Sequence, residues 1–191
     1  VRDFVSVLRE QGRSIDDHIS QAQVLDLIVN QERLEFAPGT TLRYSNSGYL
    51  LAAEIVHRVT GETLGEFAKR RVFGPLEMND TDYVADYRTV IPRAATPYKR
   101  REDGAWGNSR SRYELVGPGG VYTTVDDLLR WDRGAFIEQR LGPSIPLELQ
   151  RNGTLLDGSE IPYGLGLGLG VYRGYPTAAH GGLRGGARTT L

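Results

Sequence analysis

The hydrophobic pattern at the start of the chain predicts two helices. Apolar residues between positions 24 and 28 recur at helical spacing. Ser20 is followed three residues later by Gln23, which is the capping-box arrangement typical of a helix start. We therefore expect a short helix within residues 1–10 and a second helix from Ser20 to about Gln31.

The longest predicted helix covers residues 47–59. Leu51, Ile55 and Val59 recur at i, i+4 and i+8, which predicts that this face is buried. Gly61 follows the last periodic residue, where a left-handed glycine commonly ends a helix. The pattern therefore predicts an amphipathic helix with a defined end.

The middle of the chain combines helix starts with a polar segment. Thr63–Glu66 is another capping box, and Thr124 is placed to cap a further helix. Asp126 and Asp127 lie in the first turn of that helix, where we expect them to interact with the helix dipole. Residues 79–118 are polar and irregular, and a loop of this length in a compact domain is often functional.

The last part of the chain has the period of two that is typical of strands. From Tyr163 to Val171 the odd positions are apolar, and the even positions are all glycine. We expect a strand over this range, a turn at Gly174, and a partner strand over Thr177–Leu183. The glycine spacing is not that of a nucleotide-binding loop, and no helix follows it.

Composition narrows the classes of function. The chain has 191 residues, a net charge of −1, no cysteine and three histidines that lie far apart. A net charge this close to zero does not favour a nucleic-acid partner. The absence of cysteine excludes disulfides and thiolate metal sites. We expect no cofactor and no metal. No apolar run is long enough to predict a transmembrane segment, and composition indicates neither a compartment nor an oligomeric state.

Tyr44, Ser45 and Asn46 form the stretch of greatest chemical interest. In extended backbone, residues i and i+2 point the same way, so the phenol and the carboxamide can face one cleft. A phenol acts as a general base if positive charge lowers its pKa. The alternative is a helix cap, in which Ser45 or Asn46 closes the N-terminus and Tyr44 packs against it.

Several segments, taken in order, resemble the beta-lactamase-related serine hydrolases. This family includes class C beta-lactamases, D-aminopeptidases, related esterases and the penicillin-binding D-alanyl-D-alanine carboxypeptidases. The resemblance covers most of the chain, which looks like a bacterial sequence. It rests on Phe36-Ala37-Pro38-Gly39, Tyr44-Ser45-Asn46, Gly48–Leu51, Phe73–Met78, Gly119–Thr124 with Asp127, Leu128 and Trp131, and His180-Gly181-Gly182.

The resemblance implies an α+β fold of the serine beta-lactamase and transpeptidase type. We expect an antiparallel sheet flanked by helices plus a helical lobe, incomplete at both ends. The whole of 1–191 would be one partial domain, with a mainly helical lobe over 1–148 that contains loop 79–118, and sheet strands over 149–191.

The resemblance also implies a function and a set of site residues. The function is that of a serine hydrolase that forms an acyl-enzyme from a D-amino-acid peptide, a beta-lactam or a small ester. Tyr44 and His180 would be catalytic. Asn46, Gly181, Gly182 and Leu183 would bind the substrate, with the Leu183 amide as an oxyanion donor.

One departure from the family pattern is serious. Residues 1–191 contain no S-x-x-K, the motif that carries the nucleophilic serine and its lysine. We therefore expect the chain to be an internal fragment that is inactive alone. Two alternatives remain open: a catalytically dead homologue that binds peptidoglycan or D-peptides, and an unrelated domain in which Tyr44 is only part of a cap.

Overall fold

The computed structural model describes residues 1–14 and 17–191 and has an α+β fold, as predicted. The helices are α1 (Phe4–Glu10), α2 (Gln21–Val29), α3 (Asn46–Thr60), α4 (Leu64–Ala68), α5 (Val125–Trp131) and α6 (Ser144–Leu149), and π-helical turns over Lys69–Phe73 and Asp132–Ile137 continue α4 and α5. The strands are β1 (Ile19–Ser20), β2 (Asp82–Tyr83), β3 (Tyr98–Arg100), β4 (Trp106–Asn108), β5 (Tyr113–Glu114), β6 (Val121–Tyr122), β7 (Gly153–Thr154), β8 (Glu160–Ile161), β9 (Gly168–Tyr172), β10 (Tyr175–Ala179), β11 (Gly181–Arg184) and β12 (Ala187–Thr190).

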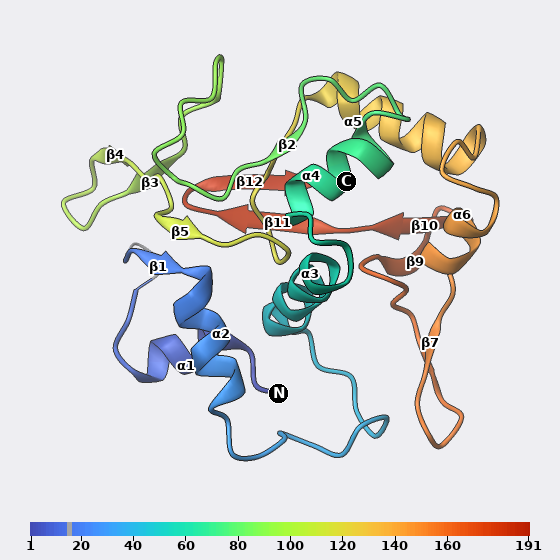
Figure 1. Ribbon diagram of the computed structural model, residues 1–191, viewed down its shortest axis with the longest axis horizontal. Helices are drawn as coiled ribbons and strands as arrows, with labels where there is room; N and C mark the ends of the chain where they lie inside the picture. The colour runs from blue at the N-terminus through green and yellow to red at the C-terminus, as the bar shows by residue number, and fades with distance from the viewer. Residues whose placement is uncertain (15–16) are drawn as a thin grey trace.

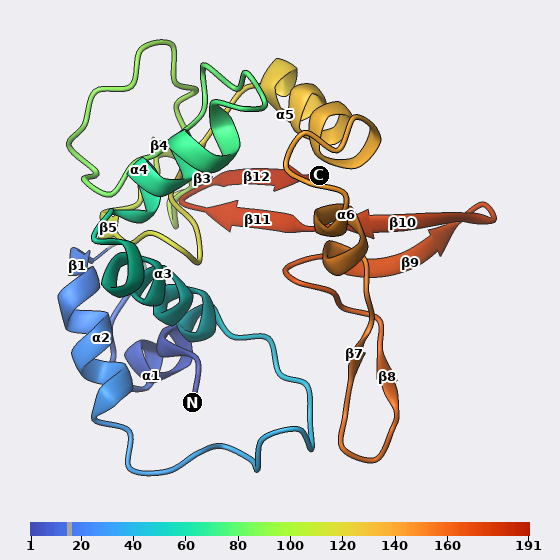
Figure 2. The same cartoon turned by 45° about the vertical axis from the view of Figure 1, so that its right-hand side comes forward.

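β11 and β12 run through the middle of the molecule, with α3 on one side and α5 on the other, and the β9–β10 hairpin extends to one side (Figures 1 and 2). β9 pairs with β10, and β11 pairs with β12, both antiparallel. His180 alone separates β10 from β11, and its backbone N–H and C=O both bond to Leu191. β1 and β5 form a parallel pair.

The predicted helix starts are confirmed in atomic detail. Ser20 and Thr63 each form a complete capping box, with Gln23 and Glu66 as the reciprocal partners. Thr124 accepts a hydrogen bond from the N–H of Asp127 at the start of α5. These caps are local side-chain-to-backbone contacts, so a three-residue spacing is enough to predict them.

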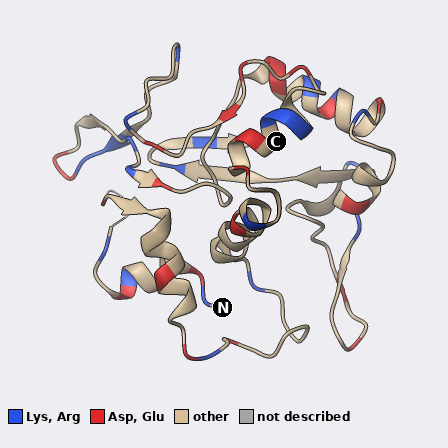
Figure 3. Cartoon of the chain, viewed as in Figure 1, with Lys and Arg blue, Asp and Glu red and all other residues tan. Residues whose placement is uncertain are grey.

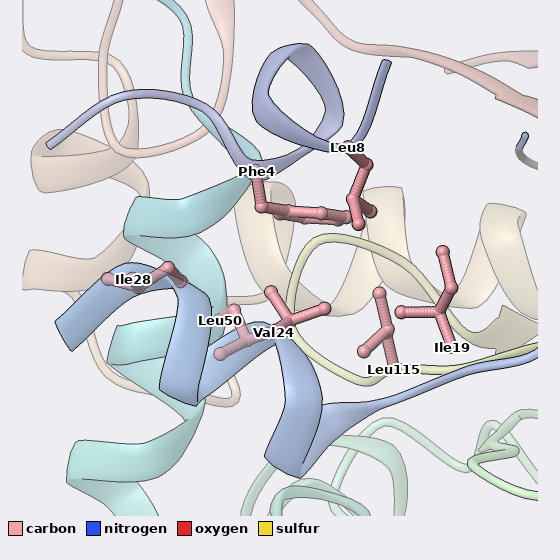
Figure 4. Close-up of a cluster of buried hydrophobic side chains, with 7 residues drawn as sticks. All are labelled: Phe4, Leu8, Ile19, Val24, Ile28, Leu50 and Leu115. Atoms are coloured by element: carbon pink, nitrogen blue, oxygen red, sulfur yellow. The ribbon is translucent and has the colours of Figure 1, made fainter. Parts of the chain in front are cut away.

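The larger hydrophobic core joins α1, α2 and α3 to β1 and Leu115. Its buried side chains are Phe4, Leu8, Ile19, Val24, Ile28, Leu50 and Leu115 (Figure 4). Each such side chain stabilises the fold by about 1.5–3 kcal/mol relative to an exposed position. This core fixes the start of α3, and with it the Tyr44–Asn46 stretch.

A second core joins the α4 region to the α5 region. It contains Ala68, Phe73, Leu76, Met78 and Ala135. The glycine at position 134 lies in this contact, because a Cβ there would come within 2.6 Å of the Leu76 side chain. The second core therefore holds together the helices on the far side of β11 and β12.

The predicted buried face of α3 is wrong at Ile55 and Val59, whereas Leu51 packs against the larger core. Ile55 and Val59 are 61% and 80% exposed, whereas Ser47, Leu50 and Ala53 are buried. Ser47 decides the orientation, because its Oγ accepts from the N–H of Phe4 and donates to the carbonyl of Arg2. The side of the helix that carries Ser47 and Leu50 therefore packs against the α1 region.

The predicted strand over Tyr163–Val171 forms only in its second half. Gly166 adopts a φ of 93°, and Gly164 accepts a hydrogen bond from the N–H of Gly166. This turn breaks the extended backbone before β9 begins at Gly168. The turn at Gly174 is confirmed: Arg173 and Gly174 have φ values of 51° and 85°, as a two-residue hairpin requires.

The predicted loop over 79–118 is more ordered than expected, since it carries strands β2 to β5. Its β3–β4 hairpin projects from the body of the molecule (Figure 1). Asp127 anchors the beginning of this segment, because the fully buried carboxylate accepts from the N–H of Asp80 at 2.9 Å and from the hydroxyl of Thr81 at 2.7 Å. Asp127 is therefore a buried structural junction as well as a residue of the first helical turn.

Candidate active site

The rings of Tyr44 and His180 lie beside each other. Their centroids are 6.1 Å apart, with the planes inclined by 32°. Tyr44 comes from the segment that leads into α3, and His180 from the junction of β10 and β11. The fold thus brings together the two predicted catalytic residues from distant parts of the sequence.

Asn46 is the first residue of α3, and its backbone is held by Asp3. One Asp3 oxygen accepts from the N–H of Asn46, and the other accepts from the N–H of Val5 in α1. Ser45 makes no side-chain capping bond. The cap hypothesis for Ser45 is therefore wrong, since the carboxylate of Asp3 stabilises this helix start instead.

The electrostatic surroundings of Tyr44 favour the neutral form of its phenol. Partial burial raises its pKa, and the negative charge of Asp3 raises it further. A phenol that accepts a proton needs the opposite shift. Within the described residues, the environment of Tyr44 therefore lacks the cation that a tyrosine base requires.

The strand β11 has one free edge beside His180. Because His180 and Leu191 form a hydrogen-bonded pair, the next such pair is Gly182 with Thr189. Gly181 and Leu183 occupy the alternate pairs, so their N–H and C=O groups point away from β12. β9 lies on that side only along β10 and stops opposite Ala179, so no strand of the described residues pairs with the 181–183 edge.

The two glycines after His180 differ in the space around them. A Cβ at Gly182 would come within 2.6 Å of the Thr189 hydroxyl, whereas a Cβ at Gly181 would lie 3.7 Å from the Thr189 carbonyl. Gly182 is therefore required by packing within the sheet. Leu183 is 80% exposed, so its side chain lies outside the cores.

Arg184 is a residue of this region that the sequence reasoning missed. Its guanidinium donates to the carbonyl of Tyr113, and burial lowers its pKa. This contact ties β11 to β5 and to the end of loop 79–118. Nothing in the spacing of the sequence indicates it, because 71 positions separate the two partners.

The charged residues do not cluster by sign into one large basic or acidic region. Basic and acidic residues are interspersed along most elements (Figure 3). In the part of the chain that is described, no group of three histidines, cysteines or carboxylates is placed to hold a metal ion. No described helix is long and apolar enough to cross a membrane.

The fold and this arrangement of residues define a beta-lactamase-type domain. A sequence model of the family described as Beta-lactamase matches residues 8–191. The chain therefore belongs to the beta-lactamase family.

Curated relatives include D-aminopeptidases from Gluconobacter oxydans (strain 621H) and Brucella ovis. Each is 28% identical over 188 residues, which is 97% of this chain. The chain spans 35% and 36% of those two proteins, respectively, or about a third of their length.

Solved structures show the same fold. The penicillin-binding protein from Bacillus halodurans has a TM-score of 0.80 at 22% identity, covering 100% of this chain and 59% of its own. A D-stereospecific amidohydrolase from Streptomyces sp. has a TM-score of 0.71 at 24% identity, covering 95% and 54%. A D-amino acid amidase from Ochrobactrum anthropi SV3, complexed with D-phenylalanine, has a TM-score of 0.70 at 21% identity, covering 90% and 52%.

Proposed function

We propose that this chain supplies the proton acceptor and the substrate-binding edge of a serine hydrolase. The substrate class is an amide or ester, with D-amino-acid peptides preferred over beta-lactams. The observation that carries the proposal is the contact of the Tyr44 and His180 rings beside the open edge of β11. The names of the relatives, D-aminopeptidase and D-amino acid amidase, support the choice of D-configured amides.

The proposed reaction proceeds through an acyl-enzyme. A serine hydroxyl attacks the substrate carbonyl and passes its proton to Tyr44, which then protonates the leaving amine. Water releases the acyl group in the second step. The Asn46 carboxamide orients the substrate amide, and the Leu183 N–H stabilises the oxyanion.

The proposal requires a cation near Tyr44 that lowers the phenol pKa. Burial and Asp3 both act in the opposite direction. A lysine of the kind found in S-x-x-K would supply this charge. Because residues 1–191 contain neither that lysine nor its serine, the chain alone does not form an acyl-enzyme.

Covalent labelling tests this division of roles. Residues 1–191 are incubated with a fluorescent penicillin and with a fluorophosphonate, beside a longer form of the protein that contains an S-x-x-K segment. We expect label only on the longer form, with Tyr44→Phe reducing the rate of labelling. Label on any serine of residues 1–191 would refute the proposal.

A non-catalytic D-peptide-binding protein is the second candidate, favoured by the raised pKa of Tyr44. A longer form that binds D-alanyl peptides but hydrolyses no p-nitrophenyl ester, nitrocefin or D-alanyl peptide would establish that candidate instead.

A further inference from the structure

Arg184 is a half-buried cation that no carboxylate neutralises. Its Nη2 donates to the carbonyl of Tyr113, and within the described residues its side chain makes no further hydrogen bond and no ion pair. Every other described arginine either pairs with a carboxylate or is exposed. Because a charge that leaves water without a charged partner is costly, this position favours an anion as the partner of Arg184.

Arg184 lies on the same face of the β11–β12 hairpin as His180. Residues i, i+2 and i+4 of a strand share a face, and the antiparallel pairing continues without a break from Arg184 to the His180–Leu191 pair. Gly182 lies between the two and has no side chain, so β11 places nothing between the imidazole and the guanidinium. Four residues of strand span about 13 Å from Cα to Cα, a length that a short peptide covers.

The turn at 117–120 leaves space beside the guanidinium. A Cβ at Gly119 would lie 3.9 Å from Arg184 Nη1, and apart from the chain neighbours of Gly119 no other atom of the described residues comes within 4 Å of that point. A Cβ at Gly120 would lie 3.6 Å from the same nitrogen. Because both residues are glycines, neither of them covers Nη1 with a side chain.

The guanidinium also lies close to the proposed oxyanion donor. Leu183 directly precedes Arg184, and its N–H points away from β12. Consecutive Cα atoms are about 3.8 Å apart, so a substrate carbonyl at this N–H can reach Arg184 through a side chain of a few bonds. A carboxylate at the end of such a side chain would supply the anion that Arg184 lacks.

We infer that Arg184 is a specificity-determining residue, which binds a carboxylate on the side chain of the substrate residue that supplies the scissile carbonyl. The inference rests on the proposed function, since it takes the Leu183 N–H as the group that holds this carbonyl. Arginine is permanently charged and matches the geometry of a carboxylate. D-glutamyl amides are therefore preferred over D-glutaminyl amides, which have the same shape without the charge, and D-lysyl amides are disfavoured.

Hydrolysis by a longer form of the protein that contains an S-x-x-K segment tests this preference. The substrates are the α-(p-nitroanilides) of D-glutamic acid, D-glutamine and D-lysine, and we expect the highest kcat/KM for the first. Arg184→Gln keeps a donor for the Tyr113 carbonyl but removes the charge. It should lower kcat/KM for the D-glutamyl substrate about tenfold, as the loss of a hydrogen bond to a charged group predicts, and change kcat/KM for the D-glutaminyl substrate less than about twofold.

Two further variants separate charge from structure. Arg184→Lys keeps the positive charge and should retain the preference for the D-glutamyl substrate. Arg188→Gln is the matched control, because Arg188 is exposed and lies on the opposite face of the same hairpin; it should leave the preference unchanged. The inference is overturned if Arg184→Gln lowers kcat/KM equally for the D-glutamyl and D-glutaminyl substrates, or leaves the ratio of the two values unchanged.

Binding to residues 1–191, followed by NMR, separates this inference from the proposed reaction because it requires no turnover. The probes are N-acetyl-D-glutamic acid α-amide and N-acetyl-D-glutamine amide. We expect the charged probe to shift the Arg184 Nε–H and Leu183 N–H signals, and the uncharged probe to shift them less. Equal shifts with both probes, or no shift with either, would overturn the inference. Charge-dependent binding that Arg184→Gln abolishes, in a protein whose longer form hydrolyses none of the three substrates, would instead overturn the proposed reaction and leave the carboxylate site standing.

Discussion

Removing the carboxylate of Asp127 should be among the most destabilising single changes in this chain. The side chain is fully buried and accepts three hydrogen bonds, from the N–H of Asp80, the hydroxyl of Thr81 and the guanidinium of Arg130. It joins the start of loop 79–118 to α5. Two substitutions test this expectation: Asp127→Ala and Asp127→Asn.

The structure predicts different losses of stability for the two substitutions. Asp127→Ala leaves the Asp80 N–H and the Thr81 hydroxyl without this acceptor, although Thr81 keeps a bond to Thr123. We expect a loss of about 2–4 kcal/mol in the free energy of unfolding, because buried donors lose their acceptor. Asp127→Asn keeps one oxygen for those two donors and loses only Arg130, which is 47% exposed. The expected loss is about 1–2 kcal/mol.

The dependence on pH gives an independent check. Burial acts to raise the pKa of Asp127, but the hydrogen bonds from Thr81, Arg130 and Asp80 outweigh it, and the pKa is lowered. A lowered pKa stabilises the fold fully above the unfolded value of about 3.9, and this contribution disappears as the pH falls through the folded value. The difference between wild type and Asp127→Asn should therefore shrink below about pH 4.

Urea denaturation followed by circular dichroism measures these differences. Asp126→Ala is the matched control, because Asp126 lies in the same first turn but is exposed. We expect it to cost less than about 1 kcal/mol through the helix dipole. Equal losses for Asp126→Ala and Asp127→Ala would show that Asp127 acts only through the dipole, and that the assigned contacts do not stabilise the fold.

Two further predictions concern the candidate site. Gly182→Ala should destabilise the chain by about 1–3 kcal/mol because the new Cβ contacts Thr189. Gly181→Ala should cost less than half as much. Urea denaturation measures both losses, and adding Thr189→Ala should restore stability only to the Gly182→Ala variant. Asp3→Asn should lower the pKa of Tyr44 by removing a negative charge, which titration of the assigned tyrosine ring carbon by NMR will show; an unchanged pKa would mean that the phenol does not sense Asp3.

The sequence predicts best those features that depend on neighbours along the chain. The capping boxes at Ser20 and Thr63, the left-handed Gly61 and the turn at Gly174 all follow from side chains within a few residues of the backbone they contact. Family resemblance added the candidate site residues, because several short motifs occur in the family's order.

The tertiary structure decided which surfaces are buried and which residues meet. Periodicity identified the apolar stripe of α3, but the structure packs the side with Ser47 and Leu50 against the α1 region and leaves Ile55 and Val59 exposed. Spacing could not predict that Asp3 would hold the backbone of Asn46. The contact of Tyr44 with His180 likewise depends on how the strands pack against α3. Sequence by itself thus determined the local caps and turns and which chemical groups are present, whereas only packing between distant segments brought Tyr44 and His180 side by side.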